Sequence, residues 1–216
     1  SCSFARRCLS LLPARKPLTS DSSPRLFNAV LHVRATGFAA GRTVAEVRKR
    51  TEHRMRIDRI SRGDGLLPVK EPSVQLQAGD RLYVRETADN LKNYERLLGA
   101  TLYNTSDVGT PVSAGVPLDE EGQQLAEAVI SRSSPLHNRT LNAAHFSTLY
   151  NLVPLAIHRT MSGADLSEDL SNIRLQAGDV LLVQGARDAI AELRSSGSIL
   201  VLDGTIDLPH TDRAPW

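Results

Sequence analysis

The five-residue sequence Leu-Gln-Ala-Gly-Asp occurs twice in this chain of 216 residues, at 76–80 and again, 99 residues later, at 175–179. A mostly apolar run follows each copy, Arg-Leu-Tyr-Val at 81–84 and Val-Leu-Leu-Val at 180–183. A Gly-Asp pair before such a run predicts a tight turn that leads into a strand, because glycine tolerates a positive φ and aspartate can bond its own backbone. Two copies in matching surroundings predict a duplicated unit.

The residues around each copy extend the repeat into a full domain. Around the first copy we expect strands at 28–33, 55–58, 82–85 and 100–103, short extended pieces at 66–69 and 74–76, and helices at 44–50 and 88–98. Around the second copy we expect strands at 128–130, 153–158, 180–183 and 199–202, and helices at 141–149 and from Asp188. Ile60 is out of phase with the strand before it, which indicates a β-bulge. Thr43 and Glu46 have the spacing of a capping box, and Gly99 is placed to end a helix.

The expected fold is therefore α+β, with two tandem β-α-β-β-α-β domains. Segments rich in proline, glycine and serine separate them. The expected organisation is a basic linker at 1–25, a first domain at 26–104, a linker at 105–123, a second domain at 124–203 and a C-terminal linker at 204–216.

The charge of the chain is divided unevenly between its two parts. Residues 1–118 hold 19 basic and 11 acidic side chains, whereas residues 119–216 hold 7 and 13. A basic flank of this kind suits an anionic lipid surface or ligand, and the alternative is that both parts are simply solvated. The composition, 41% hydrophobic and 23% charged, is that of a soluble globular protein.

The repeat resembles the TrkA-C domain, also called the RCK C-terminal lobe. The first copy carries the resemblance in Gly-Arg-Thr-Val at 41–44 together with 76–84, and the second in Asn-Arg-Thr-Leu at 138–141 together with 175–183. The family often has glycine where Asn138 stands, so the loop there is expected to differ.

Tandem TrkA-C domains resemble the cytosolic insert of permeases of the divalent-anion/sodium symporter family. The resemblance implies a ligand-sensing module at the cytoplasmic face of the cell membrane, attached to the membrane helices of its own permease. It also implies a homodimer and a small anionic or nucleotide ligand. Two alternatives stay open: the C-terminal part of a potassium-transport regulator that binds cyclic di-AMP, and the corresponding part of an amino-acid exchanger.

Enzyme chemistry is not indicated by the sequence. The chain has no GxGxxG or phosphate-binding loop, and its six histidines show no metal-ligand spacing. Cys2 and Cys8 form neither a CxxC motif nor a disulfide framework. We expect no catalytic residue, cofactor or metal, and no nucleic-acid partner, because basic residues are not combined with aromatic residues or a recognition helix.

The candidate ligand-binding residues are arginines and their neighbours. Arg42 with Thr43, and Arg139 with Thr140, occupy the same place in both copies beside an expected helix N-terminus, where free N–H groups favour an anion. Arg56 lies in an arginine-rich stretch at 48–62 that suits a phosphate or sulfate. The competing interpretation is that the threonines only cap their helices and that the arginines are solvated or protect a strand edge.

Overall fold

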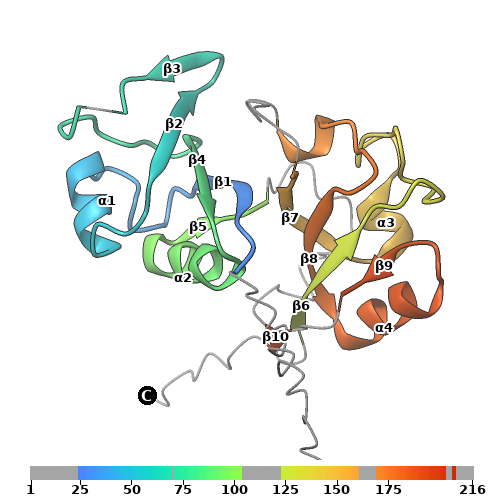
Figure 1. Cartoon of the computed structure of the whole chain (residues 1–216). Coiled ribbons are helices and arrows are strands. Elements are labelled where there is room, and N and C mark those ends of the chain that lie inside the picture. Colours follow the sequence, from blue (N-terminus) through green and yellow to red (C-terminus); the bar gives the residue numbers. More distant parts are fainter. Residues whose placement is uncertain (1–23, 70, 104–122, 161–168, 203–205, 208–216) are drawn as a thin grey trace, which may run out of the picture.

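The computed structural model describes residues 24–69, 71–103, 123–160, 169–202 and 206–207. The described residues form two lobes, 24–103 and 123–202, which lie side by side (Figure 1). The expected linkers at 1–25, 105–123 and 204–216 lie almost entirely outside the described residues.

The first lobe follows the expected order of elements. Its elements are β1 (Phe27–Val33), α1 (Val44–Arg50), β2 (Ile57–Arg62), β3 (Gly65–Leu67), β4 (Arg81–Glu86), α2 (Ala88–Leu98) and β5 (Ala100–Thr101). The strand expected at 55–58 begins two residues later, and its pairing with β4 shifts register between Ile57 and Arg59, which confirms the bulge. In α2, Leu91, Tyr94 and Leu98 face the core, and Gly99 ends the helix with a φ of 60°.

The second lobe repeats this order with shorter helices. Its elements are β6 (Gln123–Val129), α3 (Phe146–Tyr150), β7 (Val153–His158), a 3-10 helix η1 (Leu170–Asn172), β8 (Val180–Ala186), α4 (Arg187–Ser195) and β9 (Leu200–Val201). A two-residue strand, β10 (Ile206–Asp207), falls within the expected C-terminal linker and pairs with β6.

The helix expected at 141–149 is confirmed only from residue 146 onward. Residues 141–145 form turns, and α3 begins only at Phe146. His145 adopts a φ of 48°, which interrupts the helical path. Leu141 and Phe146 are both buried, but residues five apart on a continuous helix point about 140° away from each other. The interruption therefore allows both side chains to reach the core.

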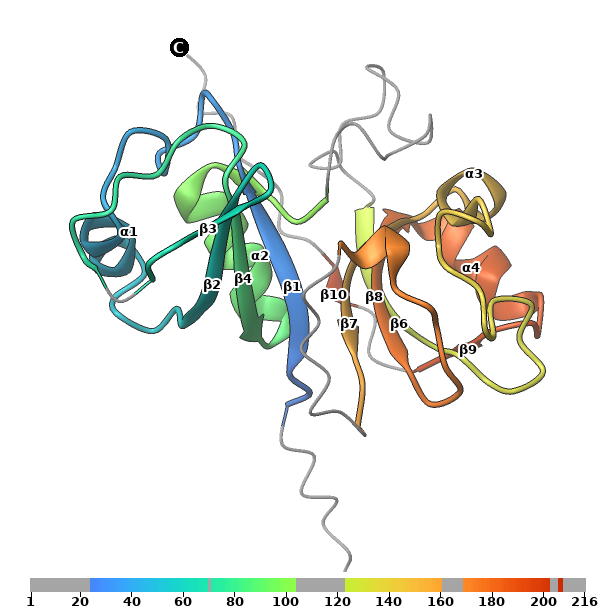
Figure 2. The same cartoon turned by 90° about the horizontal axis from the view of Figure 1, so that it is seen from above.

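One sheet runs through both lobes. The strand order is β10-β6-β8-β7-β1-β4-β2-β3, with β5 added to β1 and β9 added to β6. The lobes join where β1 pairs antiparallel with β7, through Asn28 with Ile157 and Ala29 with Ala156. Figure 2 shows these two strands at the centre, with α1 and the pair α3 and α4 at opposite outer sides.

The join buries apolar side chains as well as backbone. Leu181 and Val183 of β8 belong to the core of the second lobe. Val180 and Leu182, which point to the other face of the same strand, belong to the cluster that contains the core of the first lobe. Strand β8 is therefore covered on both faces, which explains its run of four apolar residues.

Candidate functional site

The repeated turn holds a buried aspartate in each lobe. Asp80 and Asp179 are 0% and 1% exposed, and each follows a glycine whose φ is positive. Oδ2 of Asp80 accepts a hydrogen bond from the backbone N–H of Gln77 at 2.8 Å, and Oδ2 of Asp179 accepts one from Gln176 at 2.7 Å. The expectation that the aspartate closes the turn on its own backbone is confirmed.

An arginine neutralises each of these buried carboxylates. Arg62 donates from Nε and Nη2 to the two oxygens of Asp80, both at 2.7 Å, and Nη2 also donates to the carbonyl of Gln75. Arg159 makes the same fork to Asp179 at 2.7 and 2.6 Å. The hydrogen bond to each aspartate raises the pKa of its arginine. Such two-pronged pairing makes a buried carboxylate tolerable, so these groups belong to the scaffold.

The sequence carries a signal for Arg62 and Arg159, although a structural role for them was not among the expectations. Each ends an Ile-x-Arg sequence, at 60–62 and at 157–159, which lies at the same place in both copies. Arg62 is also the last residue of the arginine-rich stretch at 48–62, for which an anion site was expected.

The first expected ligand pair lies at the start of α1. The side chain of Thr43 accepts from the backbone N–H of Glu46, whose carboxylate accepts from the backbone N–H of Thr43 at 2.8 Å, so the capping box is confirmed. These hydrogen bonds lower the pKa of Glu46. Arg42 donates to Glu46 at 3.2 Å, and its guanidinium lies 5.3 Å from the centre of the Phe38 ring. The Glu46 carboxylate thus occupies the place that an anion would take.

The second expected pair lies beside a turn and not beside a helix N-terminus. Arg139 donates to the carbonyl of Ala143 at 2.7 Å, and Oγ1 of Thr140 accepts from the N–H of Ala143 at 3.1 Å. Asn138 adopts a φ of 62°, close to the 79° of Gly41, and its N–H donates to the carbonyl of Leu175, as that of Gly41 does to Leu76. Asn138 thus keeps the conformation and the hydrogen bond of Gly41, and the two copies differ only further along, where turns at 141–145 replace the start of a helix.

The fifth expected residue, Arg56, points into solvent. Its side chain is 86% exposed and pairs with Asp58 at 3.3 Å. Among the described residues, no hydrogen bond or ion pair joins any of Arg42, Thr43, Arg56, Arg139 and Thr140 to another of the five. The structure does not gather them into one site, and a ligand role for them stays a prediction.

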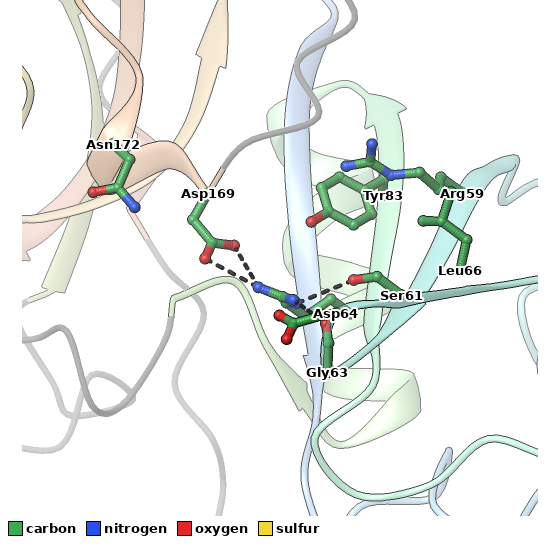
Figure 3. Close-up of a pocket in the computed structure, with 9 residues that line it drawn as sticks. Arg59, Ser61, Gly63, Asp64, Leu66, Tyr83, Asp169 and Asn172 are labelled. Atoms are coloured by element: carbon green, nitrogen blue, oxygen red, sulfur yellow. Dashed lines mark hydrogen bonds and ion pairs between the residues drawn. The ribbon is translucent and has the colours of Figure 1, made fainter.

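The structure instead places a cleft between the lobes. Its volume is about 500 Å³. The side chains come from β2, β3 and β4 of the first lobe and from the segment of η1 in the second, as Figure 3 shows. The lining residues are Arg59, Ser61, Gly63, Asp64, Leu66, Arg81, Tyr83, Asp169 and Asn172.

Arg81 crosses this cleft. Its Nε donates to Oγ of Ser61 at 3.1 Å, and Nη2 donates to the carbonyl of Gly63 at 2.7 Å. Its Nη1 faces both carboxylate oxygens of Asp169, at 3.1 and 3.3 Å, and these contacts are drawn as dashed lines in Figure 3. Two contacts therefore hold the guanidinium within the first lobe, and the third reaches the second lobe.

A second guanidinium lines the same cleft. The Arg59 guanidinium carbon lies 3.7 Å from the centre of the Tyr83 ring, a cation–π contact that fixes the orientation of the group. Arg59 belongs to the arginine-rich stretch at 48–62, whereas the sequence does not mark Arg81 and Asp169 as candidates. Only the pairing of β4 with β2 and the fold of the second lobe bring these residues together, so neighbouring sequence carries no signal for them.

The described residues show neither a metal-binding cluster nor a membrane-spanning helix. The described residues contain no group of three or more His, Cys, Asp or Glu side chains that could hold a metal ion. Within the same residues, no helix combines the length and the apolar character needed to cross a membrane.

Comparison with known proteins shows that both copies of the repeat match one domain family. Residues 33–99 and 125–196 match the model of the TrkA-C domain, and together these segments make up more than half of the chain.

Several curated proteins are similar to the chain. A proposed sulfur deprivation response regulator of Chlamydomonas reinhardtii is 26% identical over 88% of this chain and 33% of that protein. An uncharacterized transporter of Synechocystis is 32% identical over 59% of this chain and 21% of that protein. Sodium/sulfate cotransporter 1 of Chlamydomonas reinhardtii is 30% identical over 57% of this chain and 15% of that protein. The chain spans a third or less of the length of each of these relatives.

Proposed function

The chain belongs to the TrkA-C domain family, and from this premise we propose that it is the regulatory module of a sodium-coupled anion permease. The observation that carries the proposal is that two relatives are named as a transporter and a sodium/sulfate cotransporter, while the chain accounts for only 21% and 15% of them. The larger remainder has room for membrane helices. The module then lies at the cytoplasmic face, attached to the transport helices and not catalytic itself.

The proposed role is to sense a small anion or nucleotide and to pass the bound state to the membrane part. A ligand can do this only if it binds two arrangements of the module with different affinity. The backbone pairing at the join is short, because within the described residues β1 and β7 pair through two residue pairs, and apolar side chains of both lobes pack around them. Side-chain contacts add to it, including Lys92 Nζ to Gln184 Oε1 at 2.9 Å and the ion pair of Arg25 with Glu127.

The first test concerns the gene that encodes this chain. The proposal predicts groups of apolar spans of about 20 residues on both sides of it. A Rossmann GxGxxG upstream, with no such spans, would favour the potassium-transport regulator instead.

The second test concerns transport. Uptake of labelled sulfate and of labelled dicarboxylate is measured in cells that express the full-length protein or a form in which residues 24–207 are replaced by a flexible linker. We expect the replacement to change how uptake depends on the cytoplasmic anion concentration. Uptake with the same dependence in both forms would contradict a regulatory role.

A further inference from the structure

The cleft between the lobes holds two arginines of one lobe and a carboxylate of the other. We propose that it is a binding site for a small oxyanion, of the carboxylate, sulfate or phosphate class, which sits between Arg59 and Arg81 in the place now taken by the Asp169 carboxylate. This inference rests on the proposed function, because it gives the sensed ligand a position and a chemical class.

The Arg81 guanidinium is already oriented for an oxyanion. Its contacts with Ser61 and the carbonyl of Gly63 belong to its own lobe and fix the plane of the group. The remaining edge, at Nη1, faces two carboxylate oxygens of Asp169. A carboxylate of the protein thus shows that this edge accepts an oxyanion, and the forked guanidinium suits sulfate and phosphate as well.

Arg59 supplies the second positive charge. Its contact with the Tyr83 ring holds it at the wall of the same cleft, so little side-chain freedom is lost when a ligand binds. Ser61 adds a donor, because its oxygen accepts from Arg81 while its hydroxyl hydrogen can still be directed to a ligand. Figure 3 shows Arg59 and Tyr83 on one side of the cleft and Asp169 and Asn172 on the other.

The contacts of Asp169 allow an oxyanion to displace its carboxylate from Arg81. It precedes η1 but makes no capping hydrogen bond to that helix with its side chain. Its side chain is 25% exposed and that of Arg81 is 27% exposed, so water reaches the ion pair and can solvate the carboxylate once it is displaced. Among the residues that line the cleft, the charged ones are Arg59, Arg81, Asp64 and Asp169, so an oxyanion that displaces Asp169 takes over the negative charge beside Arg81.

Displacement of Asp169 also has a structural consequence. The pair of Arg81 and Asp169 joins the lobes on the cleft side. An oxyanion that takes its place removes this connection, so its binding is coupled to the arrangement of the lobes.

The test is a calorimetric titration of the chain with sodium sulfate, sodium phosphate and sodium succinate, with sodium chloride at equal ionic strength as the control for screening. The three oxyanions distinguish the members of the class. We expect Arg81→Gln to weaken binding by about tenfold or more, since a charge-assisted hydrogen bond is lost. We expect Asp169→Asn to strengthen it by about two- to fivefold, because the competing carboxylate is gone.

Matched controls separate this site from the others. Arg59→Gln is expected to weaken binding, whereas Arg54→Gln and Arg132→Gln, which remove exposed arginines outside the cleft, are expected to leave it unchanged. If Arg81→Gln does not fold, as judged by circular dichroism, the gain of affinity in Asp169→Asn decides the question.

Three outcomes would overturn the inference. Binding that is unchanged in Arg59→Gln and Asp169→Asn would place the anion elsewhere and leave the proposed function standing. Equal effects of chloride and the oxyanions would show screening only. No binding of any oxyanion to the unmodified chain would remove both this site and anion sensing, while the apolar spans of the gene would still test attachment to a permease.

Discussion

The two lobes share the turn, the buried ion pair and the order of strands, but they differ on one face of the equivalent strands β4 and β8. In β4 this face presents Arg81, Tyr83 and Arg85, whereas in β8 the same positions are Val180, Leu182 and Gln184. The residues of β8 are all buried against the first lobe or the join. The arginines of β4 are not buried, and Arg81 and Tyr83 line the cleft.

The two copies of the duplicated domain thus share the residues needed for folding and differ at a surface that serves another purpose. The residues that form the turn and its ion pair are the same in both copies, because each lobe needs them to fold. The outer face of the central strand is apolar in the second lobe, where it makes the join, and polar in the first, where it borders the cleft.

The buried ion pairs should differ in strength because their arginines differ in exposure. Arg159 is 11% exposed and Arg62 is 36% exposed. We expect Asp179→Ala to lower the free energy of unfolding by about 3–5 kcal/mol, since it leaves a nearly buried charge without its partner. Asp80→Ala should cost about 1–3 kcal/mol, because water can reach Arg62. Urea unfolding followed by circular dichroism measures both, and equal losses would contradict the assigned difference.

Exchanging the equivalent residues Tyr83 of β4 and Leu182 of β8 should destabilise the protein to different extents. Leu182→Tyr places a larger, polar-tipped side chain where the native residue is 1% exposed, and we expect a loss of about 1–3 kcal/mol from overpacking. Tyr83→Leu makes the reverse change, and its cost of about 0.5–1 kcal/mol is the loss of the contact with Arg59. Chemical unfolding of both variants tests this. A larger loss for Tyr83→Leu would mean that the first lobe, not the second, depends on this face.

The helices α2 and α4, which follow β4 and β8, should contribute differently to stability at alkaline pH. Burial, with a contribution from Glu86, raises the pKa of Tyr94 from 10.0 to about 12, and the equivalent residue of α4 is Leu193. The folded state then keeps the tyrosine proton longer than the unfolded state, so the stability is complete below about pH 10 and falls as pH rises toward 12.

Between pH 8 and pH 11 this effect should cost the protein about 1 kcal/mol that Tyr94→Phe does not lose. Burial also raises the pKa of Tyr150, which is present in both proteins and cancels in the comparison. Urea midpoints at the two pH values measure the difference. The same alkaline loss in Tyr94→Phe would show that the side chain is not protected as described.

The smallest effect concerns the loops before the first helices. Gly41 and Asn138 both adopt a positive φ, which glycine and asparagine tolerate better than other residues. The exchanges Gly41→Asn and Asn138→Gly should each change the free energy of unfolding by less than about 0.5 kcal/mol. A thermal melt of each variant is sufficient, and a marked loss in only one would show that the two loops are not equivalent.

Much of the fold could be predicted from sequence because its signals are local. The repeated Gly-Asp turn, the capping box of Thr43 and the end of α2 at Gly99 each depend on neighbouring residues. The break before α3 could not be predicted from propensity, because it serves the burial of Leu141 and Phe146 together. The TrkA-C resemblance is confirmed by the match of both copies.

The candidate site was less predictable than the fold. Arg42 and Arg139 stand out in the sequence because they recur, but the structure shows each bonded to a residue four positions further along its own copy. Arg81 and Asp169 are 88 residues apart and belong to different copies. The pairing of β1 with β7 and the apolar packing at the join place their lobes side by side, and both belong to the tertiary arrangement.

The central claim is that an oxyanion in the cleft changes how the lobes are arranged. The most direct measurement is the distance distribution between spin labels at Lys49 of α1 and Ala191 of α4, two exposed positions in different lobes, with Cys2 and Cys8 replaced by serine. We predict that sulfate shifts this distribution relative to chloride at equal ionic strength, and that Asp169→Asn without sulfate shifts it in the same direction. An unchanged distribution in the presence of bound sulfate would contradict the account.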